Sequence, residues 1–161
     1  MRKKFTAILF CALAVCAFTA CKSTGATASG EQLPNPIVSY DTLADAAKVT
    51  GFELAAPDAV DGYDTRTIQV VDDKMIQVTY TKGEDQLLIR KAAGAGDISG
   101  DYNTYAETNT VAVGSLSVLM KGEKGMVSVA TWADGDSTFA VDAQDIPMTT
   151  DTMSAMIEKI Q

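Results

Sequence analysis

The sequence contains no histidine, and its three cysteines all lie within the first 21 of 161 residues. Without histidine, Ser-His-Asp and Cys-His catalytic sites and His-ligated metals are excluded. Because no cysteine follows Cys21, the rest of the chain has no disulfide and no thiolate ligand for zinc, so core packing alone must hold its fold. Basic residues are also scarce, 13 against 21 acidic ones. This balance argues against a nucleic-acid partner, which would need a basic face.

The longest apolar run is too short for a membrane anchor. Residues 5–20 contain only Thr6 and Thr19 as polar residues, and Arg2, Lys3 and Lys4 precede them. A bilayer-spanning helix needs about 20 apolar residues, whereas a secretory signal peptide has a basic start and a shorter apolar stretch. The N-terminus therefore predicts an export signal.

The end of this run carries a cysteine in a lipoprotein context. Phe18-Thr19-Ala20-Cys21 resembles a lipobox, with Phe18 where leucine is usual. We therefore expect a signal peptide over residues 1–20, a flexible linker over 21–34 with acylated Cys21, and a single domain over 35–161. The expected location is the outer face of the cytoplasmic membrane, with the lipid bilayer bound through the acyl chains.

A secreted, soluble protein is the alternative. Ala26-Thr27-Ala28 matches the A-x-A cleavage pattern, although it lies ten residues beyond Phe18. In a host with two membranes, Lys22 after the cysteine favours the outer one, by resemblance to the usual sorting signal. Cleavage before Cys21 leaves 10 basic and 21 acidic residues, a formal charge of −11 that repels anionic headgroups.

The first part of the domain predicts one helix and two strands. The helix spans residues 43–50, with Asp41 as N-cap and Gly51 as its end. Strands over 67–71 and 75–81 flank a turn. In the second strand, alternation predicts one buried and one solvent-facing side, with Ile76, Val78 and Tyr80 inward and Gln77, Thr79 and Thr81 outward.

The remainder predicts strands joined by turns, followed by a helix. Gly114-Ser115 is a II′-type hairpin candidate, and a Gly/Ala-rich loop over 92–100 is expected to be flexible. The closing helix spans 151–160, with an apolar stripe of Met153, Met156, Ile157 and Ile160. The predicted fold class is α+β: an antiparallel β-sheet (meander) with an N-terminal and a C-terminal helix packed on one face.

Several short segments resemble a known family. They are residues 89–94 (IRKAAG), 97–103 (DISGDYN) and 130–132 (ATW), with Asn35-Pro36, Gly51-Phe52 and Tyr80. Together they look like a domain of unknown function common in Gram-positive envelope proteins. That family occurs as small lipoproteins and as the extracytoplasmic end of anti-sigma-factor-like membrane proteins. The resemblance implies an extracytoplasmic setting and an α+β fold, and it implies no catalytic residues.

Carboxylates are the plentiful reactive groups. A glycosidase-like pair or a calcium site could be drawn from six of them: Asp72, Asp73, Asp97, Asp101, Asp134 and Asp136. All six sit at predicted turns, where aspartate is expected for its own backbone hydrogen bonds. The 97–101 spacing also lacks the glycine and glutamate of an EF-hand.

Aromatic side chains give the remaining candidate site. Tyr102, Tyr105 and Trp132, with Phe139, could stack on a sugar or peptide, although core packing of Trp132 and Phe139 is the favoured interpretation. We expect a non-enzymatic binding or sensing domain with no cofactor and no metal, acting on an unidentified envelope ligand or protein. The alternatives are a carrier or chaperone with an apolar cavity under the helices, and a carboxylate-based cell-wall hydrolase.

Overall fold

The computed structural model describes residues 36–161, which lie within one compact unit, Pro34–Gln161. Its elements follow in the order β1 (Ile37–Tyr40), α1 (Leu43–Thr50), β2 (Thr65–Val71), β3 (Met75–Lys82), β4 (Asp85–Ala93), β5 (Glu107–Val113), β6 (Leu116–Glu123), β7 (Met126–Asp134), β8 (Ser137–Asp142), β9 (Met148–Thr149) and α2 (Thr150–Ile157).

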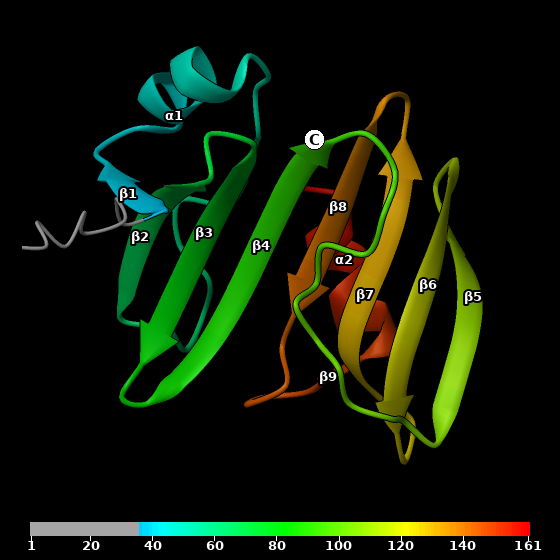
Figure 1. Ribbon diagram of the computed structural model, residues 1–161. Helices are drawn as coiled ribbons and strands as arrows, with labels where there is room; N and C mark the ends of the chain where they lie inside the picture. The colour runs from blue at the N-terminus through cyan, green and yellow to red at the C-terminus, as the bar shows by residue number, and fades with distance from the viewer. Residues whose placement is uncertain (1–35) are drawn as a thin grey trace, which may run out of the picture. The chain divides into compact units, whose positions relative to one another are not determined.

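All strands join one antiparallel sheet in the order β1-β2-β3-β4-β8-β7-β6-β5, with β9 beside β7 (Figure 1). Two meanders, β2–β4 and β5–β8, meet where β4 pairs with β8. Because β5 lies at the far end of the sheet, residues 94–106 must cross several strands to reach it. The predicted antiparallel sheet with two helices is confirmed.

One face of the sheet forms the core. A row of directly paired, buried side chains runs across six strands: Ile68, Val78, Ile89, Val141, Ala130 and Met120. Residues directly opposite each other in paired strands project from the same face of the sheet, so the whole row lies on one side. The predicted inward set of β3 is confirmed, since Ile76, Val78 and Tyr80 are at most 1% exposed.

The first helix has its predicted span but not its predicted N-cap. The Thr42 hydroxyl, rather than Asp41, accepts a hydrogen bond from the Asp45 N–H at 3.1 Å. Thr42 holds the extended conformation next to the first helical residue, which is the position from which a side chain reaches the first-turn N–H groups. Gly51 ends the helix as predicted, with φ of 80°.

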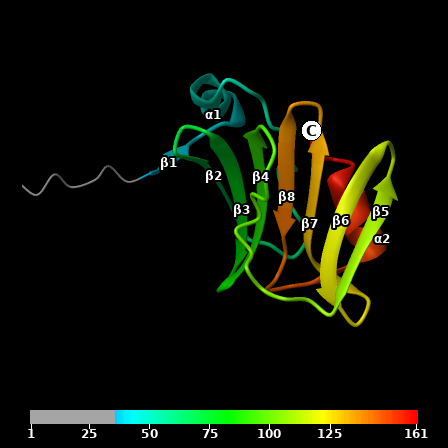
Figure 2. The ribbon, with the colours of Figure 1, turned by 45° about the vertical axis from the view of Figure 1, so that its right-hand side comes forward.

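The second helix is shorter than predicted, since α2 ends at Ile157 rather than at residue 160, but the predicted apolar stripe packs as expected. Met153, Met156, Ile157 and Ile160 are all buried, and they join the same hydrophobic cluster as Ala46 of α1. Figure 1 shows α2 behind β7 and β8, while the segment between β4 and β5 crosses in front of them. The turned view in Figure 2 shows the same separation. Within residues 36–161, neither helix is long and apolar enough to cross a bilayer.

The second face of the sheet differs from the prediction. Thr79 is only 9% exposed and Gln77 is half-buried, although both were expected to face solvent. Residues 97–103 cover this side of the strands, and Ser99 is completely buried there. The alternation of β3 therefore predicts correctly which side chains face the core. It could not indicate that residues 97–103 cover the other face of the strand.

The hairpin turns agree closely with the sequence. Gly114 has φ of 56° and Ser115 has no positive φ, as a II′ turn requires. The Gly/Ala-rich loop is fastened at its start, because Gly94 donates to the Asp136 carbonyl at 2.7 Å and accepts from the Thr138 hydroxyl at 2.6 Å. The short strands β1 and β9 were not predicted.

Candidate functional site

A half-open pocket of about 410 Å³ lies between the 57–63 segment and α2. Its walls are mostly apolar, and its lining consists of Pro57, Ala59, Val60, Asp61, Tyr63, Ile146, Met148, Thr152, Ala155, Met156 and Lys159. This volume is within the range of small-molecule sites, about 300–1,000 Å³. The pocket is therefore a candidate binding site in the described part of the chain.

The pocket lies beside the core stripe of α2. Met153 and Ile157 are buried in the core, whereas Thr152, Ala155 and the edge of Met156 line the pocket, together with Lys159 just beyond the end of the helix. Small residues at Ala155 and Ala59 leave the space open. On the opposite wall, the Tyr80 hydroxyl donates a hydrogen bond to the Pro57 carbonyl, which fastens the 57–63 segment to β3.

One polar group in the wall has no partner. The Tyr63 hydroxyl is buried and makes no hydrogen bond within residues 36–161. Burial raises its pKa, and the nearby charges of Asp85 and Asp145 raise it further. Because the hydroxyl oxygen is enclosed, it stays without a partner inside the wall, which is unfavourable by about 1–3 kcal/mol.

The mouth of the pocket carries both signs of charge. Asp61 and Lys159 line it, and neither forms an ion pair with any residue in the described range. Both side chains belong to exposed residues, so their charges are available to a ligand. The arrangement can hold an apolar group in the pocket and a charged or polar group at the mouth.

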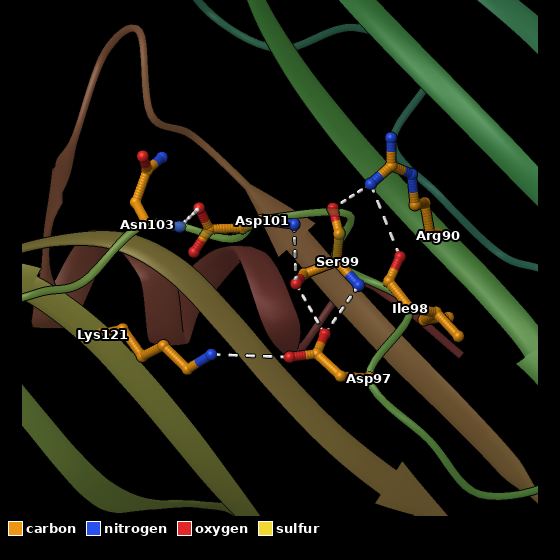
Figure 3. A network of polar contacts seen from close by, with 7 residues as sticks. All are labelled: Arg90, Asp97, Ile98, Ser99, Asp101, Asn103 and Lys121. Carbon is orange, nitrogen blue, oxygen red and sulfur yellow. Dashed lines mark hydrogen bonds and ion pairs between the residues drawn. The ribbon is translucent and has the colours of Figure 1, made fainter.

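A second polar cluster lies on the opposite face of the sheet, centred on Arg90 (Figure 3). Its Nε donates to the Gln77 side-chain oxygen at 2.8 Å, and its Nη1 donates to the carbonyls of Ser99 and, at 3.5 Å, Ile98. Burial lowers the pKa of Arg90, while the charge of Asp142 opposes this shift. Arg90 thus fixes the covering segment to the strands.

The carboxylates of the covering segment bind their own backbone (Figure 3). Asp97 accepts from the Ser99 N–H at 2.9 Å and its hydroxyl at 2.6 Å, and Lys121 lies 3.5 Å from its second oxygen. The hydrogen bond from the Ser99 hydroxyl is the main cause that lowers the pKa of Asp97. Asp101 accepts from the Asn103 N–H at 2.9 Å. These are turn-stabilising contacts, as aspartate at a turn predicts.

One carboxylate in this region was missed by the sequence analysis. Asp142 on β8 lies diagonally across from Arg90, because Leu88 pairs with Asp142 and Arg90 with Ala140. Burial raises its pKa, against hydrogen bonds from Gln144 and the charge of Arg90. Nothing in the local sequence marks this aspartate, since its surroundings include residues of β4 and β7 and Asp101 of the covering segment.

The predicted aromatic site is not assembled. Tyr102 is 97% exposed on the covering segment, and Tyr105 is half-buried there. Trp132 is 4% exposed on the core face and stacks on Phe139, with ring centroids 5.2 Å apart. The core interpretation of Trp132 and Phe139 is therefore confirmed, and Trp132 must be withdrawn as a ligand-stacking residue.

The other candidate carboxylates are also separate. Asp72 and Asp73 form the β2–β3 turn with positive φ values, whereas Asp134 and Asp136 lie at the β7–β8 turn. Across residues 36–161, no three acidic groups converge in a way that could hold a metal ion. The predicted lipidation site, Cys21, lies outside the described residues.

The pocket was also missed by the sequence analysis. The spacing of Thr152, Ala155 and Lys159 beside the core stripe was a possible signal. However, the sequence could not place the 57–63 segment against the last helix, almost a hundred residues later. Comparison with known proteins adds no relative: no family model, curated protein or solved structure matches this chain.

Proposed function

We propose that this chain is an envelope lipoprotein, tethered through acylated Cys21, whose folded domain binds a small ligand without converting it. The anchoring part rests on the basic start, the short apolar run and the lipobox-like Phe18-Thr19-Ala20-Cys21. The resemblance to the envelope-protein family supports the same setting. The binding part rests on the structure of the domain.

The observation that carries the binding proposal is the apolar pocket beside α2. An apolar body would fill the space around Val60, Ala155 and Met156. A charged group of the ligand would remain at the mouth, near Asp61 and Lys159. The proposed ligand class is therefore a small amphiphilic molecule.

The fold part of the proposal is that both helices cover one face of the sheet. The shared hydrophobic cluster of Ala46 and Met153 supports it. A carrier under the helices was expected to have its cavity between helix and sheet. Met153 and Ile157 on that side of α2 are instead fully buried, so the pocket on the flank of α2 favours binding of a small ligand over transport of a long chain.

The pocket can be tested with anilinonaphthalene sulfonate, an apolar fluorescent anion. We expect saturable binding to the folded chain with one site. Ala155→Trp fills the pocket and should weaken binding at least about tenfold, or about 1.4 kcal/mol. Val49→Trp, on the exposed side of α1 and outside the lining of the pocket, is the matched control and should bind as wild type does. Equal binding by both variants would contradict the pocket assignment.

The tether is tested by the intact mass of the membrane-extracted protein, with Cys21→Ala beside it. A chain that begins at Cys21 with added acyl mass, absent from the variant, supports the anchor. A chain that begins at Ser29 without acyl mass supports the secreted alternative and contradicts the anchor.

A further inference from the structure

The sheet ends in a strand with one open edge. Among residues 36–161, β5 pairs with β6 only, and no other strand lies beyond it. It is seven residues long, without proline, and Glu107 is its one charged residue. Such an edge is a template for another strand, and proteins usually guard it with proline, lysine or an inward charge.

The hairpin geometry identifies the free backbone groups. A two-residue turn at Gly114 and Ser115 makes Val113 and Leu116 a hydrogen-bonded pair, and bonding then recurs at every second residue. Val111 and Asn109 therefore also bond to β6. The N–H and C=O groups of the alternate residues, Thr108, Thr110 and Ala112, point out of the sheet, and all three residues are exposed.

The one charged side chain of β5, Glu107, does not block pairing of another strand with its edge. The carboxylate oxygens of Glu107 accept from the Gly125 N–H at 3.1 and 3.3 Å, which ties the side chain to the β6–β7 turn. The other end of the sheet is different, since β1 has four residues and follows Pro36. The open edge of β5 is thus the longer and less protected one.

We propose that two copies of this protein associate through β5, antiparallel and centred on Thr110, so that their sheets become continuous. In this register Thr110 faces Thr110 of the second copy, and Thr108 faces Ala112. The outward backbone groups satisfy one another, and the Thr–Thr pair is a favourable cross-strand contact. Glu107 lies opposite Val113, so no like charges face each other.

The core side of the strand also suits a second copy. A hollow of about 260 Å³ beside β5 is lined partly by Asn109, Val111, Met120 and Val127. In the proposed register, Val111 of each copy faces Asn109 of the other and extends the apolar lining of this hollow. A second copy is chosen over an unrelated strand because this register pairs Thr110 with itself and places no like charges opposite each other.

The test uses the mature chain from position 21 with Cys21→Ala, which has no other cysteine. Paired residues at a hydrogen-bonded antiparallel position lie about 5.5 Å apart between Cα atoms, within the range of a disulfide. We expect Thr110→Cys to give a disulfide-linked dimer under mild oxidation. Thr108→Cys is the matched control and should stay monomeric, because its counterpart is Ala112.

Sedimentation velocity of the cysteine-free chain provides the second measurement. We expect a dimer fraction that rises with protein concentration and with salt, since salt screens the acidic domains. Thr110→Pro removes an outward N–H without breaking a bond to β6, so it should abolish the dimer while near-wild-type circular dichroism shows that the chain is folded. A monomer at all concentrations, or equal cross-linking at positions 108 and 110, would overturn the proposal.

Discussion

At the residue scale, Gly122 marks the closest backbone approach among the glycines. A Cβ atom there would lie 1.9 Å from the Met126 carbonyl oxygen. The pairing of β6 with β7 shifts by one residue between Lys121 and Gly122, so a bulge brings the two backbones together. Glycine is required here by contact rather than by backbone conformation, since its φ is not positive.

We therefore predict that Gly122→Ala destabilises the domain by about 1–3 kcal/mol, because the β7 backbone must move. Urea unfolding monitored by circular dichroism measures the change. Ser117→Ala, at an exposed position of the same strand, is the comparison and should change the unfolding free energy by less than about 0.5 kcal/mol. Unfolding free energies that fall equally in the two variants would contradict the contact argument.

Two aspartates should respond to pH with opposite signs. The pKa of Asp97 is lowered by the Ser99 hydroxyl, so this carboxylate stabilises the fold above its ordinary pKa of 3.8, and the gain disappears as pH falls below that value. The pKa of Asp142 is raised by burial, so its ionisation destabilises the fold as pH rises above 3.8 through the raised value.

Asp97→Asn should accordingly lose stability relative to wild type at pH 7, and the difference should shrink towards pH 3. Asp142→Asn should gain relative to wild type between pH 3 and pH 7. The measurement is the urea midpoint of each variant across this pH range. If the urea midpoints of the two variants changed with pH in the same way, the opposite pKa shifts of Asp97 and Asp142 would be contradicted.

At the element scale, the N-cap residue of α1 can be identified by mutation. Thr42 and Asp41 are both good N-cap residue types, but only the Thr42 hydroxyl reaches the Asp45 N–H. Thr42→Ala should therefore cost about 1 kcal/mol, typical of a lost cap. Asp41→Ala should change stability by less than about 0.5 kcal/mol, as for an exposed residue. Thermal unfolding of the two variants distinguishes them, and a larger effect at Asp41 would restore the original prediction.

Element identities were largely predictable because their signals are local. Alternation in β3, the II′ turn at Gly114 and the stripe from Met153 to Ile160 all appear within a few consecutive residues. The predictions failed where residues distant in sequence determine the environment of a strand. The second face of β3 was predicted to be solvent-facing, because the sequence of β3 gives no sign of the covering segment that Arg90 on β4 holds against it.

At the scale of the whole molecule, Pro34–Gln161 has its own core and no cysteine. We predict that a chain limited to these residues folds alone and unfolds in a single cooperative transition. A reducing agent should leave its Tm unchanged, since no disulfide exists to be broken. Calorimetry with and without dithiothreitol measures this. A broad or multistep transition would indicate that the core depends on residues before Pro34.

The sequence by itself determined the acidic balance, the order of most strands and the positions of both helices, because composition and periodicity are local properties. The export signal that it also predicts lies outside the described residues. Only the tertiary structure decided where the 94–106 segment lies, that Trp132 belongs to the core, and that the 57–63 segment forms a pocket with α2. These outcomes depend on contacts between residues far apart in the chain. Each such contact is selected by what remains to be buried once the local elements have formed, and no short stretch of sequence carries that information.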